Sequence, residues 1–338
     1  MIEVEGNIVF PFSLEAVLLI LIALVFGFYN GLHDSSNVVA TVISTRAMRP
    51  RLALWMAALA NGVGPLLFGV AVAETIGHEV VAERAVTLPV VYAALLAAIL
   101  WNVITLKLGI PSSTSHALIG GMVGPVLAGY GSGAILVNGL LKVLLTLFLS
   151  PILGMIAGYW IIKLCFFLAR GATPRVSVWF QRGQIVTAAT LALSHGTNDA
   201  QKTMGIIALG LVATGQMTTF HIPLWVILAS AAAMGAGTLF GGWSLIRTLG
   251  AGFYRLRPVH GFSAQTASSA VILGAALLGG PVSTTHVVSS AIVGAGSAER
   301  VQKVRWGVVN SIVVSWFLTI PAAAALGALL YAIIRPLF

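Results

Sequence analysis

The chain contains only two aspartates, and they occupy matching places in two similar segments. Asp34 lies in G-L-H-D-S-S-N at 31–37, and Asp199 lies in G-T-N-D-A-Q-K at 196–202. Apolar sequence surrounds both segments, and an ionised carboxylate at membrane depth is costly unless it is paired or faces a cavity. Such residues usually mark the path of an ion or proton, so we favour this role over helix packing against neighbouring hydroxyl groups.

The residues around the two aspartates are suited to holding a cation. Glycine, serine and asparagine form helices poorly, so we expect each segment to break its helix and expose backbone carbonyls. Carboxylate, amide and carbonyl oxygens are ligands of hard cations. We therefore predict cation or proton coupling at Asp34, Asn37, Asn198 and Asp199, with Asp34, Asn37 and Asp199 as candidate metal ligands.

Lys202 breaks the match between the two segments, because the first segment has Asn37 at that position. A fixed ammonium group there can replace a bound cation or neutralise Asp199, so we include Lys202 among the coupling residues. The alternative is a lysine that only extends its charge toward the membrane surface.

A second repeated pair is suited to holding an anion. Residues 111–124 (P-S-S-T-S-H-A-L-I-G-G-M-V-G) and 281–294 (P-V-S-T-T-H-V-V-S-S-A-I-V-G) are identical at six of fourteen positions. Proline and hydroxyl residues begin helices, whose first turn offers free N–H groups and the positive end of the dipole. The predicted anion ligands are Ser113, Thr114, Ser115, Ser283, Thr284 and Thr285. Helix capping and packing is the alternative.

Histidines accompany all four of these segments. His116 and His286 repeat within the second pair, and we predict that they carry protons. His33 and His195 lie beside the aspartates, where a packed, hydrogen-bonded histidine is the simpler interpretation. A divalent oxyanion between the two aspartates would create a negative charge that Lys202 only partly offsets, so cations must travel with the anion. This predicts symport.

Composition places these motifs in a membrane. Charged residues make up 8% of the 338 residues, hydrophobic residues 58%, and the mean hydropathy is +1.00. Apolar runs long enough to cross ~30 Å of hydrocarbon recur along the chain without the alternation of a β-barrel. We expect an all-α polytopic membrane protein forming a single transporter domain over 1–338, in contact with the lipid bilayer of the cell (inner or plasma) membrane.

The net charge of +9 sits in short basic loops, so a nucleic-acid partner is excluded. The acidic N-terminal segment and the positive-inside rule predict an N-terminus outside the cell. Counting spans then places the basic residues of 300–305 outside, on the opposite face from Arg255 and Arg257, against that rule.

The two repeats divide the chain into halves of 14–169 and 184–335, joined by a linker at 170–183. Each half is expected to contain a broken helix with its aspartate, two full spans, one re-entrant hairpin, and two more spans separated by Pro151 or Pro321. Five crossings per half would invert one half relative to the other and bring the hairpins together near the midplane.

Taken together, these motifs resemble those of the inorganic phosphate transporter (PiT) family, particularly its bacterial low-affinity permeases, over nearly the whole chain. The resemblance implies two inverted repeats, phosphate held between the hairpin tips, and import by cation-coupled symport. Family members that use sodium typically have G-A-N-D-V-A-N-A in both halves, and eukaryotic members have glutamates where this chain has Asn61 and Gln265. The neutral residues and Lys202 favour protons, with phosphate alone or as a metal complex.

Several alternatives stay open. The co-transported cation could be sodium or a divalent metal with phosphate, and the anion could be sulfate, although phosphate can donate a proton to an aspartate and sulfate cannot. An intramembrane hydrolase using Ser113, His116 and Asp34 is disfavoured because the set occurs twice, and a channel would not drive uphill uptake. We expect no enzyme activity and no covalently bound cofactor; a homodimer is compatible with the sequence.

Overall fold

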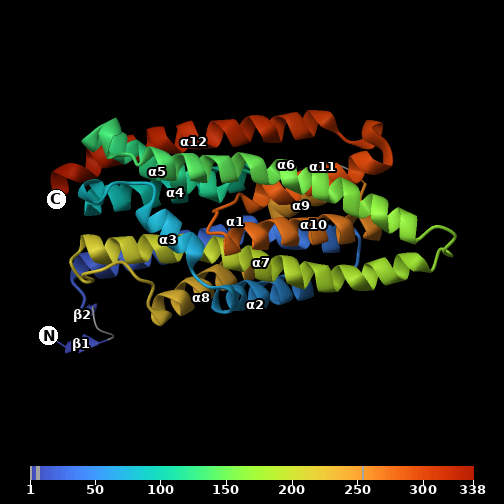
Figure 1. Ribbon diagram of the computed structural model, residues 1–338, viewed down its shortest axis with the longest axis horizontal. Helices are drawn as coiled ribbons and strands as arrows, with labels where there is room; N and C mark the ends of the chain where they lie inside the picture. The colour runs from blue at the N-terminus through green and yellow to red at the C-terminus, as the bar shows by residue number, and fades with distance from the viewer. Residues whose placement is uncertain (1, 5–7, 253–254) are drawn as a thin grey trace.

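The computed structural model describes residues 2–4, 8–252 and 255–338, nearly all of them helical (Figure 1). A short antiparallel strand pair, β1 (Ile2–Val4) and β2 (Ile8–Phe10), precedes the helices. The first half contains α1 (Leu14–Ser44), α2 (Pro50–Phe68), α3 (Ala71–His78), α4 (Leu88–Leu108), α5 (Thr114–Tyr130) and α6 (Val137–Leu168). The second contains α7 (Val176–Ala213), α8 (Leu224–Phe240), α9 (Trp243–Ala251), α10 (Pro258–Leu277), α11 (Thr284–Arg300) and α12 (Trp306–Ile334). Short 3-10 turns lie at Glu83–Ala85, Ser132–Ala134, Val301–Lys303 and Arg335–Leu337.

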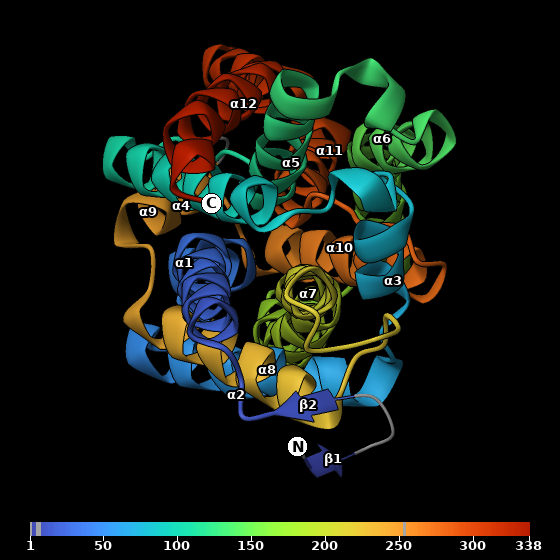
Figure 2. The same cartoon turned by 90° about the vertical axis from the view of Figure 1, so that its left-hand side faces the viewer.

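The helices of the two halves interlock. Helix α5 of the first half packs along α12 of the second, and α11 of the second packs along α6 of the first (Figure 2). In the same way α1 packs against α8, and α7 packs against α2. The core of the bundle is therefore formed largely by contacts between helices of different halves. The inverted orientation of the two repeats stays a prediction.

Long apolar helices dominate the bundle. Five of the described helices (α1, α2, α4, α6 and α12) are long and apolar enough to cross a membrane, and α8 with α9 forms a sixth candidate that is bent by 71°. The predicted all-α membrane protein is confirmed, but five crossings per half are not reached by this criterion. One cause is that each proline-containing stretch forms one helix.

Pro151 and Pro321 lie inside the continuous helices α6 and α12 and do not separate two spans. Proline lacks the N–H that would bond the carbonyl four residues earlier. In α6 the hydroxyl of Ser150 donates a hydrogen bond to that carbonyl, on Leu147, at 3.4 Å. Neighbouring serine residues are a known way to keep a transmembrane helix intact at a proline.

The aspartate segments are continuous helix, which corrects the expected breaks. Asp34 lies within α1 and Asp199 within α7. The two glycines serve close helix packing instead: a Cβ atom on Gly31 would lie 2.1 Å from the carbonyl oxygen of Met234, and one on Gly196 would lie 2.2 Å from that of Asn61. Small residues let membrane helices approach closely, so the glycines bring α8 and α2 against the aspartate helices.

The basic residues of 300–305 lie beside Arg255 and Arg257, which overturns their expected position on the opposite face. Arg257 and Lys303 contact Glu299 at 2.9 and 3.6 Å. A single surface pocket of about 590 Å³ is lined by Arg255, Arg257, Glu299, Lys303 and Arg305. The reason is that α10 and α11 run inward and back, so the segments before and after the hairpin emerge at the same end of the bundle.

Part of the expected linker at 170–183 is helical, because α6 ends at Leu168 and α7 begins at Val176. Residues 176–183 therefore belong to the second half's first helix. Strand β1 and the C-terminus lie at the end of the bundle opposite to this linker (Figure 1).

The turns of both hairpins lie inside the bundle. The α4–α5 turn ends in the buried Ser112 and Ser113, and the α10–α11 turn ends in the buried Val282 and Ser283. Buried turns need internal hydrogen-bond partners, and the polar middle parts of α1 and α7 lie beside them. This arrangement positions the candidate site.

Candidate functional site

Asp34 is fully buried and receives hydrogen bonds from the first turns of α5 and α11, the second helices of the two hairpins. Thr114 of α5 donates to its Oδ2 at 2.9 Å, and Thr285 of α11 donates to its Oδ1 at 3.1 Å. The neighbouring His33 Nδ1 lies 2.8 Å from Oδ1. The aspartate of the first half is thus held by hydroxyl groups from both halves.

Asp199 is equally buried but carries a different set of contacts. Lys202 Nζ contacts its Oδ1, while Thr284 donates to Oδ2 at 3.0 Å. His195 Nε2 lies 3.0 Å from the same Oδ2. Two nitrogen groups and one hydroxyl therefore surround this carboxylate, whereas two hydroxyls and one histidine surround Asp34.

The six predicted anion ligands lie together but do different things. Ser113 and Ser283 are the N-caps of α5 and α11, accepting from the amides of His116 and His286 at 3.1 and 3.3 Å. Ser115 donates to the Val282 carbonyl of the opposite hairpin at 2.9 Å. The remaining three, Thr114, Thr284 and Thr285, all donate to the aspartates.

Buried asparagines complete the polar cluster. Asn37 Nδ2 lies 3.4 and 3.0 Å from the hydroxyls of Thr284 and Thr285. Asn198 Nδ2 donates to the Gly280 carbonyl at 3.3 Å, and Asn30 Nδ2 donates to the Asp199 carbonyl at 3.4 Å. Within the described chain, the side-chain oxygens of all three asparagines are buried without a hydrogen-bond partner. Unpaired buried acceptors are costly, and amide oxygens are among the ligands that hard cations accept.

His116 and His286 stand against each other, with ring centroids 4.5 Å apart. His286 also stacks on Trp316 at 3.9 Å, and His116 Nδ1 lies 2.8 Å from Ser113 Oγ. His116 Nε2 and both ring nitrogens of His286 are buried without a hydrogen-bond partner in the described part of the chain. The pair joins the two hairpin helices, and its predicted proton-carrying role stays a prediction.

His33 and His195 contact the aspartates directly. The simpler interpretation of the sequence assigns them a packing role only. Their spacing carries a signal that could have identified them: His33 is adjacent to Asp34, and His195 stands one helical turn before Asp199. His195 Nδ1 lies 3.1 Å from Asn61 Oδ1, so a residue of α2 orients its ring.

Ser35 and Gln201 lie beside the aspartates, and their side chains bond to backbone amides at the points where neighbouring helices are interrupted. Ser35 Oγ accepts from the amide of Gly242 at 2.8 Å, where α8 ends and α9 begins. Gln201 Oε1 accepts from the amides of Val72 and Ala73 at the start of α3, at 2.7 and 3.1 Å. The helix of Asp34 is thereby fixed to the bent pair α8–α9, and the helix of Asp199 to the start of α3.

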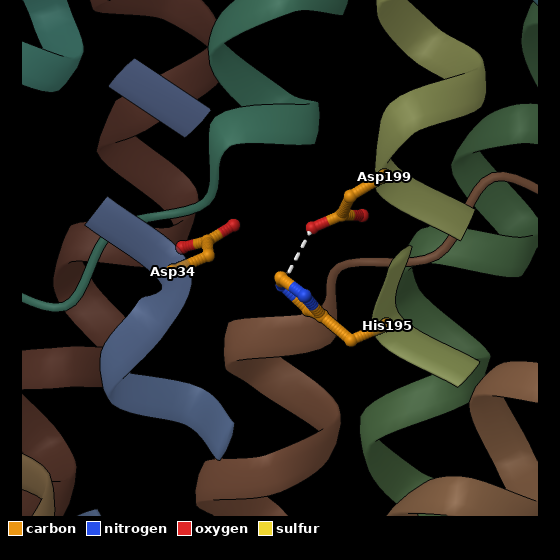
Figure 3. A group of neighbouring side chains, drawn as sticks. All are labelled: Asp34, His195 and Asp199. Carbon is orange, nitrogen blue, oxygen red and sulfur yellow. Dashed lines mark ion pairs between the residues drawn. The ribbon is translucent and has the colours of Figure 1, made fainter. Parts of the chain in front are cut away.

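Among the His, Cys, Asp and Glu side chains of the described residues, the two aspartates and His195 form the one group that could together hold a metal ion. One ligand atom from each of Asp34, His195 and Asp199 lies within 4.8 Å of the others. Figure 3 shows the carboxylates facing each other from α1 and α7, with the His195 ring beside the gap. The predicted ligand Asn37 has an amide oxygen, a donor type outside this grouping of histidines and acidic residues, so its role stays a prediction. The donor set is mostly oxygen, as hard cations prefer.

Every side chain at the heart of this cluster is closed off from solvent. Asp34, Asp199, Lys202 and His195 are 0% exposed, and the six hairpin residues are at most 3% exposed. Loading and release of a ligand would therefore require the hairpins or the bent helices to move. The site is an occluded polar cluster between two halves of an apolar bundle.

Comparisons with known proteins give a consistent assignment. The family model described as the phosphate transporter family matches residues 30–327. A probable low-affinity inorganic phosphate transporter of Rhizobium meliloti is 44% identical, with 97% of this chain and 98% of that protein covered. One of Bacillus subtilis is also 44% identical, with 95% and 98% covered.

A solved structure shares the fold. It is described as the sodium-dependent phosphate transporter and superposes with a TM-score of 0.88 at 24% identity, covering 96% of this chain and 100% of that one. With a family model over most of the chain and relatives aligned along nearly their full length, the chain belongs to the phosphate transporter family, a family of membrane transporters and not of enzymes.

Proposed function

We propose that this chain imports inorganic phosphate across the cell membrane together with protons. The proposal rests on the family, on the hydroxyl groups at the starts of α5 and α11, and on the contact between His195 and Asp199. Phosphate would bind at the start of α5 and α11, where first-turn amides lack partners within their own helix. The predicted ligands remain Ser113, Thr114, Ser115, Ser283, Thr284 and Thr285.

The three threonines link anion binding to the aspartates. Each of Thr114, Thr284 and Thr285 now donates its hydroxyl proton to a carboxylate. A hydroxyl has one proton to donate, so a threonine that turns toward phosphate leaves its aspartate short of a donor. An ionised carboxylate buried in this way is costly, and an arriving cation or proton would restore the balance.

The contact between His195 and Asp199 is the observation that favours protons. Asn61 Nδ2 donates to Thr238 Oγ1 at 2.9 Å, which leaves Asn61 Oδ1 to accept from His195 Nδ1. A neutral ring protonated at Nδ1 has only a lone pair at Nε2, and that atom lies 3.0 Å from Asp199 Oδ2. An additional proton, on His195 or on Asp199, turns this repulsion into a hydrogen bond.

Phosphate fits this site better than sulfate, because near neutral pH phosphate keeps a proton that it can donate to Asp34 or Asp199 and sulfate has none to give. A neutral metal–phosphate complex is a second form of the cargo, supported by the grouping of Asp34, His195 and Asp199. Sodium coupling is the alternative. The solved sodium-dependent neighbour does not decide for it, because a likeness at 24% identity carries the fold alone.

The basic end of the bundle would face the cytoplasm. The linker, the segment before α10 and the segment after α11 carry basic residues, and Arg257 and Lys303 meet at one pocket. By the positive-inside rule this end is cytoplasmic, which places the N-terminus outside a bacterial inner or plasma membrane.

Uptake of radiolabelled phosphate into proteoliposomes tests the proposal. An acidic exterior without sodium should drive uphill uptake, and sulfate in excess should leave that uptake unchanged. Uptake that needs sodium at constant pH would reverse the choice of cation, and competition by sulfate would reverse the choice of anion. Uptake unchanged after collapse of every cation gradient would overturn symport.

A further inference from the structure

The two aspartates occupy matching positions in the repeats, but the charges of the residues around them differ. Counting three residues along the helix from Asp34 leads to Asn37, and the same count from Asp199 leads to Lys202. Residues at this spacing lie on one helix face. The first half therefore has a neutral amide where the second half has an ammonium group.

The contacts of the two residues differ accordingly. Lys202 Nζ contacts Asp199 Oδ1 and lies 3.5 Å from the Val282 carbonyl in the α10–α11 turn. Asn37 turns its amide nitrogen to the hydroxyls of Thr284 and Thr285. Its Oδ1 has no hydrogen-bond partner among the residues described. Lys202 thus sits between a carboxylate and a backbone carbonyl, which are two oxygen ligands of the kind a hard cation uses.

Burial makes the ammonium group a permanent part of this site. Lys202 and Asp199 are both 0% exposed, so an ion pair there has no solvent to exchange with. Breaking such a pair leaves an uncompensated buried charge. The lysine side chain is covalently fixed and cannot leave with phosphate, unlike a bound ion.

We propose that Lys202 is a tethered cation that takes the place of one co-transported cation at Asp199. Each phosphate then moves with one cation fewer than two equivalent halves would require. The remaining mobile charge binds at Asp34, where Asn30 and Asn37 lie on the same face of α1 with unpaired oxygens, and on the His195 side of Asp199. This inference deepens the proposed symport function and rests on it.

Lys202→Asn tests the inference, because it gives the second half the residue of the first. Phosphate affinity of the purified protein is measured against Na⁺ concentration at fixed pH, and against pH without Na⁺. Each cation that must bind with phosphate changes the apparent affinity by up to about tenfold per tenfold change in its concentration. One slope is that of the logarithm of phosphate affinity against the logarithm of Na⁺ concentration, and the other is that against pH. The sum of their magnitudes should rise by about one in Lys202→Asn. It should stay as in wild type in the control Lys142→Met, whose lysine pairs with Glu79 at the surface.

A folded Lys202→Asn protein with an unchanged sum of slopes would overturn the inference. So would a folded protein that binds no phosphate even at saturating Na⁺ and low pH, because a mobile cation would then not replace the ammonium group. Lys202→Met, which removes the charge without supplying an oxygen, should gain less from added cations than Lys202→Asn. If wild type itself takes up no phosphate under any cation gradient, the proposed function fails and not merely the role of Lys202.

Discussion

Thr285 of α11 donates a hydrogen bond to Asp34 of α1 at 3.1 Å, so a hairpin start of the second half holds the aspartate of the first. Thr114 makes the corresponding contact from its own half, on the other carboxylate oxygen. A change at either hairpin is therefore felt at Asp34 directly. In the proposed mechanism, this contact lets anion binding at the start of α11 and cation binding at Asp34 influence each other.

Replacing that hydroxyl should weaken phosphate uptake. Thr285→Val keeps the size of the side chain but removes a hydrogen bond to a charged group, which is worth about 1.5–3 kcal/mol. We expect roughly a tenfold or greater loss of phosphate uptake at low phosphate concentration. Thr319→Val is the matched control, since that hydroxyl bonds only to the backbone of its own helix, at Ser315. Equal uptake by wild type and Thr285→Val would remove Thr285 from the site.

A methyl group at Gly31 should loosen the packing of α1 against α8. The added Cβ would meet the Met234 carbonyl oxygen at 2.1 Å, closer than any allowed contact. Gly31→Ala should lower the thermal unfolding temperature in detergent, although alanine is the better helix former by about 1 kcal/mol. Gly274→Ala serves as the control because its Cβ would enter open space within α10. A melting temperature as high in Gly31→Ala as in that control would contradict the packing argument.

Gln201 should prove to be a structural residue and not a ligand. Its side chain accepts from the amides of Val72 and Ala73 and donates to the Gly69 carbonyl at 2.7 Å. Gln201→Leu leaves the buried amides of Val72 and Ala73 without this acceptor, at a cost of about 1–3 kcal/mol each. We expect lower thermal stability, while the cation dependence of any remaining uptake stays as in wild type. An altered cation dependence would instead place Gln201 in the coupling machinery.

His195 should be required for proton-driven uptake. His195→Gln keeps a hydrogen-bonding side chain near Asn61 but removes the group that can share a proton with Asp199. Uphill uptake driven by a pH gradient should fall by an order of magnitude or more, in line with the loss of a positioned proton carrier. His221→Gln, at a partly exposed position outside the site, should behave as wild type. Full retention of gradient-driven uptake in His195→Gln would rule out this role.

The repeats in the sequence were enough to predict which polar residues meet. Asp34 and Asp199, the hairpin hydroxyls, and the neighbouring rings of His116 and His286 do lie together. Their meeting could be predicted because each sits at the same place in its half, and because buried polar groups must find one another in an apolar bundle.

Features that depend on a distant partner could not be predicted in this way. Gly31 reads as a helix breaker until Met234 of α8 is seen to lie against it. Ser150 preserves α6 at Pro151 through a contact that composition does not specify. The two ends of a hairpin lie at the same end of the bundle when its first helix runs inward and its second runs back. A count of apolar stretches does not reveal this geometry.

The most direct test of coupling is a simultaneous measurement of proton and phosphate movement in sodium-free proteoliposomes containing a pH-sensitive dye. Addition of phosphate outside should acidify the lumen, with proton and phosphate entering in a fixed ratio, and both fluxes should disappear in Asp34→Asn and Asp199→Asn. Phosphate entry without proton entry, or fluxes that survive both substitutions, would contradict proton-coupled transport through the paired aspartates.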